Sequence, residues 1–172
     1  MMKRYMERIW ELMNDPKAKK NIPLYDEALP KGISFDQLRI ITGRVYAYLK
    51  ARNIGKEDFV LIKLPRGVQP IIAMLGVWRA GAALVIVEDT LAPERVDFIY
   101  KDCNCKIAIT SEEWEKINLC EPLDGYEETD PHDAAYAVYT SRTTVNPKGV
   151  LHEYGNLERC KASANYQGKE IF

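Results

Sequence analysis

Short, continuous apolar runs alternate with amphipathic stretches through the middle of this chain of 172 residues. The runs at 58–64, 83–87 and 106–110 read as buried strands, because most of their positions are apolar rather than every second one. The stretches between them, at 68–81 and 93–103, have helical spacing. Strands that alternate with helices of about 10 to 15 residues indicate βαβ units. The sequence therefore predicts an α/β fold, with a mostly parallel sheet covered by helices on both faces.

The first fifty residues extend this pattern with two helices and a hairpin. Residues 3–13 have helical periodicity, and 22–35 contain two short extended runs around a Pro-Lys-Gly turn at 30–32. A second helix opens at Ser34, and Gln37 is its capping-box partner. This helix carries apolar residues at regular spacing and is the clearest element in the sequence.

The last third of the chain returns to a strand-and-helix alternation. A short helix begins at Ser111, and the acidic segment 124–133 is expected to be a solvated linker. Strands are expected at 134–140 and 149–154, and a last helix is expected at 155–165.

Charge and hydropathy exclude two classes of function. The chain has 24 Lys and Arg residues against 25 Asp and Glu, so no basic surface is predicted for nucleic acid. Its longest apolar tract, 71–87, is too short for a membrane span and contains Arg79. The charged start lacks the apolar core of a signal peptide, so we expect a cytoplasmic protein.

No residue pattern predicts a metal site or a nucleophile. Cys103 and Cys105 form the one close cysteine pair, which does not match zinc spacing, and we expect reduced thiols. His132 and His152 are isolated and are expected on the surface and in a strand. Ser141 lies outside any G-x-S-x-G motif, so no catalytic residue is assigned.

The segment 139–150, "YTSRTTVNPKGV", is rich in hydroxyl groups and follows the strand expected at 134–140. Hydroxyl and backbone N–H groups can surround phosphate oxygens, and a lysine such as Lys148 neutralises them as a point charge. The Walker-A pattern is absent. From its residues alone, the segment is either a phosphate-binding loop or a solvated turn.

Three elements, in the right order, resemble the adenylate-forming (AMP-binding) ligase superfamily. Residues 134–150 are similar to its ATP-phosphate loop, Y-T-S-G-[ST]-T-G-x-P-K-G-V. "ISFDQL" at 33–38 and the segment 76–110 resemble two earlier elements of its amino-acid-activating branch. The match is closest to nonribosomal peptide synthetase adenylation domains and D-alanine-activating ligases. It implies that 1–172 is a single partial domain, the N-terminal portion of the adenylation domain.

The resemblance also implies an activity and a set of contacts. Family members use ATP with Mg²⁺ to convert a carboxylate to an acyl-adenylate, and then transfer the acyl group to the thiol of a carrier protein. Gly149 corresponds to the turn into the next strand. The expected β- and γ-phosphate contacts are Thr140, Ser141, Thr143, Thr144 and Lys148.

Several positions depart from the family pattern. Arg142 and Val145 occupy the two loop positions at which the family has glycine. Glycine there would allow positive φ and a close approach of the backbone to a phosphate. Arg142 could compensate through a bidentate phosphate contact. We therefore expect a degenerate phosphate loop, and the sequence leaves open whether the chain binds ATP. The other departures are Ile86, Glu88, Asp89 and Tyr154.

Three functional hypotheses follow. The first is a truncated N-terminal portion of an amino-acid-activating ligase without complete activity alone, because the adenosine- and substrate-binding segments of the family would lie beyond Phe172. The second is a non-enzymatic assembly or binding module that associates through an exposed sheet edge. The third is a free-standing nucleotide or phosphate binder that depends on Lys148.

Overall fold

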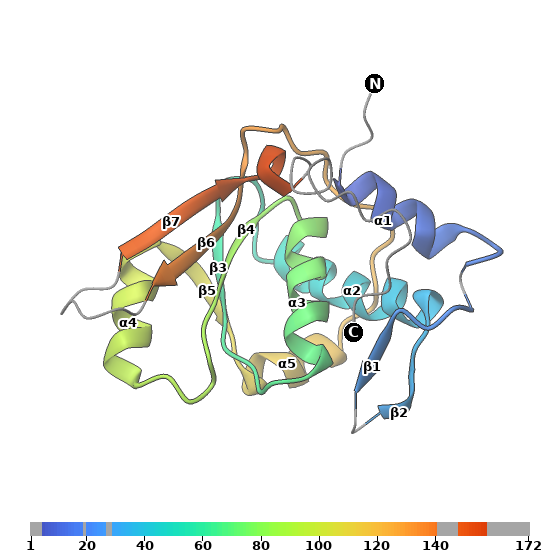
Figure 1. The fold of residues 1–172 in the computed structure, drawn as a ribbon, viewed down its shortest axis with the longest axis horizontal. Helices are drawn as coiled ribbons and strands as arrows, with labels where there is room; N and C mark the ends of the chain where they lie inside the picture. Colours follow the sequence, from blue (N-terminus) through green and yellow to red (C-terminus); the bar gives the residue numbers. More distant parts are fainter. Residues whose placement is uncertain (1–4, 19, 27–28, 141–147, 158–172) are drawn as a thin grey trace, which may run out of the picture.

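The computed structural model describes residues 5–18, 20–26, 29–140 and 148–157, and a five-stranded sheet forms its centre (Figure 1). The strand order is β5-β3-β4-β6-β7. The first four of these strands are parallel, whereas β7 runs antiparallel to β6. This sheet confirms the predicted α/β fold. The strands are β3 (Phe59–Ile62), β4 (Ala83–Ile86), β5 (Cys105–Ile109), β6 (Ala134–Thr140) and β7 (Lys148–Glu153).

Helices cover both faces of the sheet (Figure 1). On one face, α3 and α5 lie against the strands, α2 packs on both of these helices, and α1 packs on α2. On the other face, α4 covers a smaller apolar cluster that includes Leu61, Val85 and Ile99. Successive side chains of β3 and β4 point to opposite faces of the sheet, so these two strands contribute to an apolar core on each face. The helices are α1 (Tyr5–Asn14), α2 (Phe35–Lys50), α3 (Val68–Arg79), α4 (Pro93–Asp102) and α5 (Ser111–Asn118).

The start of the chain forms the predicted hairpin and capped helix, with one correction. Strand β1 (Leu24–Asp26) pairs antiparallel with β2 (Leu29–Ile33), and the Ser34–Gln37 capping box is present at the start of α2. The prediction of a turn at 30–32 is wrong, because those residues lie inside β2. The register already joins the two strands at the start of β2, before the proline is reached.

Arg79 is fully buried at the end of α3 and holds the segment between α5 and β6. Its guanidinium donates to the carbonyl oxygens of Leu123 (2.8 Å) and Gly125 (2.9 Å) in that segment. It also donates to the carbonyl of Arg39 and the hydroxyl of Thr42 on α2, each at 2.8 Å. Burial lowers the pKa of Arg79 to about 10. The arginine therefore joins three parts of the chain.

The acidic segment 124–133 is a connection without helix or strand, and it is solvated only in part: Asp124, Glu128 and 130–132 are exposed, whereas other residues pack against α2. Thr129 is buried, and the Glu127 carboxylate accepts hydrogen bonds from Tyr46 (2.6 Å) and Lys50 (2.8 Å) on α2. The hydrogen bonds from Lys50 and Tyr46 lower the pKa of Glu127. Charge composition alone cannot reveal such partners, because they are more than seventy positions away in the sequence. Within the described residues, no helix is both long and apolar enough to cross a bilayer.

Candidate functional site

The predicted loop joins β6 to β7 at the carboxyl edge of the parallel strands (Figure 1). Thr140 is the last residue of β6 and pairs with Lys148, the first residue of β7. Lys148 is exposed. Open α/β sheets bind their ligands along this edge, outside the carboxyl ends of the strands. The residues predicted between these two strands, Ser141, Arg142, Thr143, Thr144 and Val145, lie outside the described residues.

Gly149, which the family resemblance assigns to the turn into the next strand, is the second residue of β7. It faces Tyr139 on β6, and a Cβ atom at this position would come within 2.8 Å of the Tyr139 ring. A side chain there would therefore push the ring away. The glycine allows the ring to lie against the backbone at the base of the loop.

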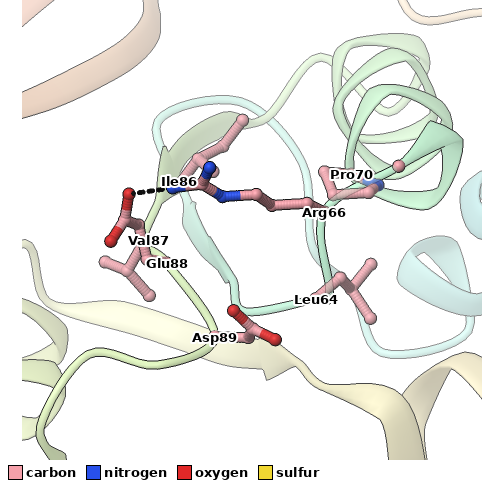
Figure 2. Close-up of a pocket in the computed structure, with 8 residues that line it drawn as sticks. Leu64, Arg66, Pro70, Ile86, Val87, Glu88 and Asp89 are labelled. Carbon is pink, nitrogen blue, oxygen red and sulfur yellow. Dashed lines mark hydrogen bonds and ion pairs between the residues drawn. The ribbon is translucent and has the colours of Figure 1, made fainter.

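A hollow of about 310 Å³ opens at the carboxyl ends of β3 and β4 (Figure 2). Arg66, which follows β3, reaches across to Glu88, which follows β4, with 2.9 Å between Nη2 and Oε1. Both side chains are exposed, so this ion pair contributes little stability. None of the described predicted site residues lines the hollow. Its lining is Leu64, Arg66, Gly67, Pro70, Ile86, Val87, Glu88 and Asp89.

Sequence reasoning missed this hollow, although one signal was present. Charged residues follow both buried strands, with Arg66 after β3 and the pair Glu88 and Asp89 after β4. Neighbouring parallel strands end at the same edge of the sheet, so the side chains that directly follow β3 and β4 are expected to lie near one another. The two acidic positions were noted only as departures from the family pattern.

The N-terminus of α3 borders the hollow but is already occupied. Helix N-termini attract anions through their free N–H groups. Here Asp26 of β1 accepts a hydrogen bond from the backbone N–H of Val68, at 3.0 Å from Oδ2. A Cβ atom at Gly67, which has φ of 142°, would lie 2.6 Å from the same oxygen. A carboxylate from the chain itself thus fills the position that a phosphate would take, which leaves the β6–β7 connection as the candidate phosphate site.

The two histidines lie at the far end of the β6–β7 pair. His152 lies in β7 and stacks on Tyr136 with 4.6 Å between ring centroids. His132 is exposed and approaches Glu153, with 3.1 Å between Nδ1 and Oε2. In the part of the chain that the structure describes, no group of three or more His, Cys, Asp or Glu side chains could hold a metal ion.

Comparison with known families matches residues 17–170 to the AMP-binding enzyme model. The chain belongs to the AMP-binding enzyme family. The chain is 25% identical over 172 residues to tyrocidine synthase 2 of Brevibacillus parabrevis, in an alignment that covers 91% of the chain. It is 30% identical over 135 residues to surfactin synthase subunit 1 of Bacillus subtilis, which covers 71% of the chain. The chain spans only 5% and 4% of these two relatives.

Solved structures confirm the fold of the chain, which matches that of an N-terminal subdomain. The Klebsiella oxytoca NpsA N-terminal subdomain, in complex with 3-hydroxyanthranilyl-AMSN, aligns with a TM-score of 0.77 at 21% identity. The luciferase-like enzyme of the mealworm Zophobas morio aligns with a TM-score of 0.78 at 19% identity. The alignments cover 92% and 97% of this chain, but only 42% and 46% of the neighbours.

Proposed function

We propose that this chain is the ATP-phosphate-binding portion of an amino-acid-activating, acyl-adenylate-forming ligase, and that its 172 residues alone do not complete the reaction. The observation that carries the proposal is the pairing of Thr140 with Lys148 at the carboxyl edge of the sheet, on either side of the loop. The peptide synthetases among its relatives support an amino acid as the substrate and a carrier protein as the partner.

The chemistry assigned to this part of the ligase is binding and charge neutralisation. In the whole enzyme, a carboxylate attacks the α-phosphate of ATP and pyrophosphate leaves. Lys148 would lie against the β- and γ-phosphates, where a cation offsets the charge of the leaving pyrophosphate. Support for an adenylate product comes from the anthranilate CoA ligase AuaEII, which was solved with anthranoyl-AMP and aligns with a TM-score of 0.72 at 17% identity.

The carboxylates on the same edge fit a magnesium ion that arrives with the nucleotide. Proteins usually hold Mg²⁺ through one or two carboxylates together with phosphate oxygens. Glu88, which pairs with Arg66, and Asp89 line the hollow at the carboxyl ends of β3 and β4 and are oxygen ligands of this kind. Mg²⁺ would offset their repulsion of the triphosphate, and they would hold the ion once ATP is bound.

The loop itself is proposed to be degenerate. Non-glycine residues held at positive φ cost about 1–3 kcal/mol each, and a β-branched residue such as Val145 is the less favourable case. Titration calorimetry with Mg-ATP tests the loop. The double variant Arg142→Gly, Val145→Gly is expected to bind more tightly than the parent chain, and Lys148→Ala more weakly. Lys106→Ala is the matched control, because Lys106 is an exposed strand lysine near the opposite edge of the sheet.

Two results would contradict different parts of this proposal. If neither the parent chain nor the glycine variant gives a heat of binding at millimolar Mg-ATP, the proposed phosphate binding is refuted. The hypothesis of a free-standing nucleotide binder is then refuted as well. Amino-acid-dependent pyrophosphate exchange tests completeness separately. Robust exchange by the isolated chain would show that these residues do complete adenylation, whatever the calorimetry gives.

The exposed edge strand β7, with apolar side chains on both of its faces, favours a second candidate, a non-enzymatic assembly module. Val150 and Leu151 in β7 are 50% and 57% exposed. Among the described residues, no further strand pairs with the outer edge of β7. Such an edge can add a strand from a second copy. This candidate predicts concentration-dependent dimers in sedimentation, lost in Leu151→Lys and kept in Leu119→Lys, whose leucine is 86% exposed at the end of α5. A sharp monomer at high concentration would exclude it.

A further inference from the structure

One tyrosine joins the base of the candidate phosphate loop to α4. Tyr139, the residue before Thr140 on β6, donates from its hydroxyl to Oδ2 of Asp102, the last residue of α4, at 2.5 Å. The two residues are 37 positions apart in the sequence. Figure 1 shows the loop end of the β6–β7 pair beside α4. The hydrogen bond therefore connects the β6 side of the loop to an element from a distant part of the chain.

The Tyr139 ring is also in contact with β7. Tyr139 pairs with Gly149 in the β6–β7 register, and a Cβ atom at Gly149 would come within 2.8 Å of Cζ and 3.0 Å of the hydroxyl oxygen of the tyrosine. Glycine therefore leaves the space through which the ring reaches Asp102. The ring packs in addition against the smaller apolar cluster between the sheet and α4. Both strands that hold the loop thus share contacts with one side chain.

The hydrogen bond has a fixed direction. Burial, and then the hydrogen bond to Asp102, raise the pKa of Tyr139, so the phenol keeps its proton and remains the donor. Its single proton lies toward Asp102, and the Cys103 sulfur, 3.1 Å from the phenol oxygen, can approach only as a weak donor. A hydrogen bond to a carboxylate is stronger than one between neutral groups. Asp102 is therefore the partner that decides where the tyrosine hydroxyl lies.

We propose that Tyr139 is a positioning residue for phosphate binding, which orders both ends of the loop through its contacts with Asp102 and Gly149. This inference rests on the proposed function of the loop as an ATP-phosphate site. The next backbone pair beyond Tyr139 and Gly149 is Thr140 with Lys148, from which the loop starts and to which it returns. A binding loop whose ends are ordered in advance loses less conformational entropy when its ligand binds. Tyr139 acts through the backbone and does not itself contact the phosphates.

Hydrogen exchange of the full chain without nucleotide tests the restraint itself. Tyr139→Phe keeps the ring but removes the donor, so backbone amides at the loop end of the β6–β7 pair should exchange roughly ten-fold faster. Asp102→Ala removes the acceptor and should have the same effect, whereas Asp102→Asn keeps an acceptor and should retain slow exchange. Both replacements of Asp102 are neutral, so their difference separates the hydrogen bond from the charge. Tyr100→Phe, at another half-buried tyrosine beside the smaller apolar cluster, is the matched control.

Calorimetry with Mg-ATP tests the connection to binding, with Arg142→Gly, Val145→Gly as the background. Tyr139→Phe and Asp102→Ala should each weaken binding by up to roughly ten-fold, and Asp102→Asn and the control should not. The measurement is made where circular dichroism shows every variant folded, so a merely structural role would leave the affinity unchanged. If the background gives no heat of binding, the proposed function fails and the positioning role fails with it. If the background binds but Tyr139→Phe leaves either the exchange or the affinity unchanged, only the positioning role is refuted.

Discussion

Replacement of Arg79 by methionine tests how the irregular segment before β6 is held. Methionine keeps much of the buried volume but removes a guanidinium that donates to three carbonyl oxygens and one hydroxyl. Hydrogen bonds from a charged group contribute about 1.5–3 kcal/mol each, and the penalty for burying the ion is several kcal/mol. The difference leaves an expected loss of about 3–5 kcal/mol in the free energy of unfolding.

Urea denaturation followed by far-ultraviolet circular dichroism and tryptophan fluorescence measures this loss. The fluorescence also reports locally, because the Arg79 guanidinium lies 4.8 Å from the ring centroid of Trp10. Arg66→Met is the matched control, since it removes an exposed ion pair and should cost about 0–1 kcal/mol. Arg79→Lys should lose most of the same stability, because an ammonium lacks the planar fork that reaches all four acceptors. A loss below about 1 kcal/mol in Arg79→Met, or one equal to the control, would refute the reasoning.

Three further changes are expected to have measurable effects on stability. Gly76→Ala places a Cβ atom 2.3 Å from Cβ of Val45 and should lower the free energy of unfolding, measured by urea denaturation, by about 1–3 kcal/mol. Gly55→Ala should be nearly neutral, because its added Cβ would lie 3.7 Å from the nearest atom, the carbonyl oxygen of Ala80. Ser34→Ala removes the capping box and should lower the thermal midpoint by the equivalent of about 1 kcal/mol, with no loss of α2. Burial and the hydrogen bond to Glu127 raise the pKa of Tyr46 from 10.0 to about 12. Between pH 10 and 12 the folded chain therefore keeps the Tyr46 proton, whereas the unfolded chain releases it. The contribution of Tyr46 to the free energy of unfolding is fully present below pH 10 and is lost as the pH rises from 10 to 12. Tyr46→Phe should flatten that fall, and an unchanged slope would contradict the assignment.

Hydrophobic patterning predicted most of the regular elements, because each of them has a local signature. The strand at 134–140 agrees with β6 residue for residue, and the capping box at Ser34 is present. The antiparallel direction of β7 follows from its short connection to β6, since a parallel strand would need a longer crossover. Local sequence was sufficient to predict an element wherever the residues of that element alone determine its backbone conformation.

Features that depend on distant partners could not be predicted in this way. Arg79 reads as an interruption in an apolar tract, and only the fold shows that it is fully buried with four acceptors. The Pro-Lys-Gly turn at 30–32 failed because strand pairing, not turn propensity, sets the register of that hairpin. The hollow beside Glu88 was missed because its walls come from two strand ends that are neighbours only in the folded sheet. At the candidate site, sequence order located the flanks of the loop, whereas its phosphate contacts stay predictions.

The β6–β7 register has a consequence for how this site can change over time. Six backbone pairs, from Ala134 with Glu153 to Thr140 with Lys148, align the two strands on either side of the loop. Doubling the length of such a connection costs only about 0.6 kcal/mol in closure entropy. The connection can therefore vary in sequence and length while the sheet persists. If the loop binds phosphate as proposed, changes in its chemistry would therefore act on ligand binding while the strand pairing on either side stays in place.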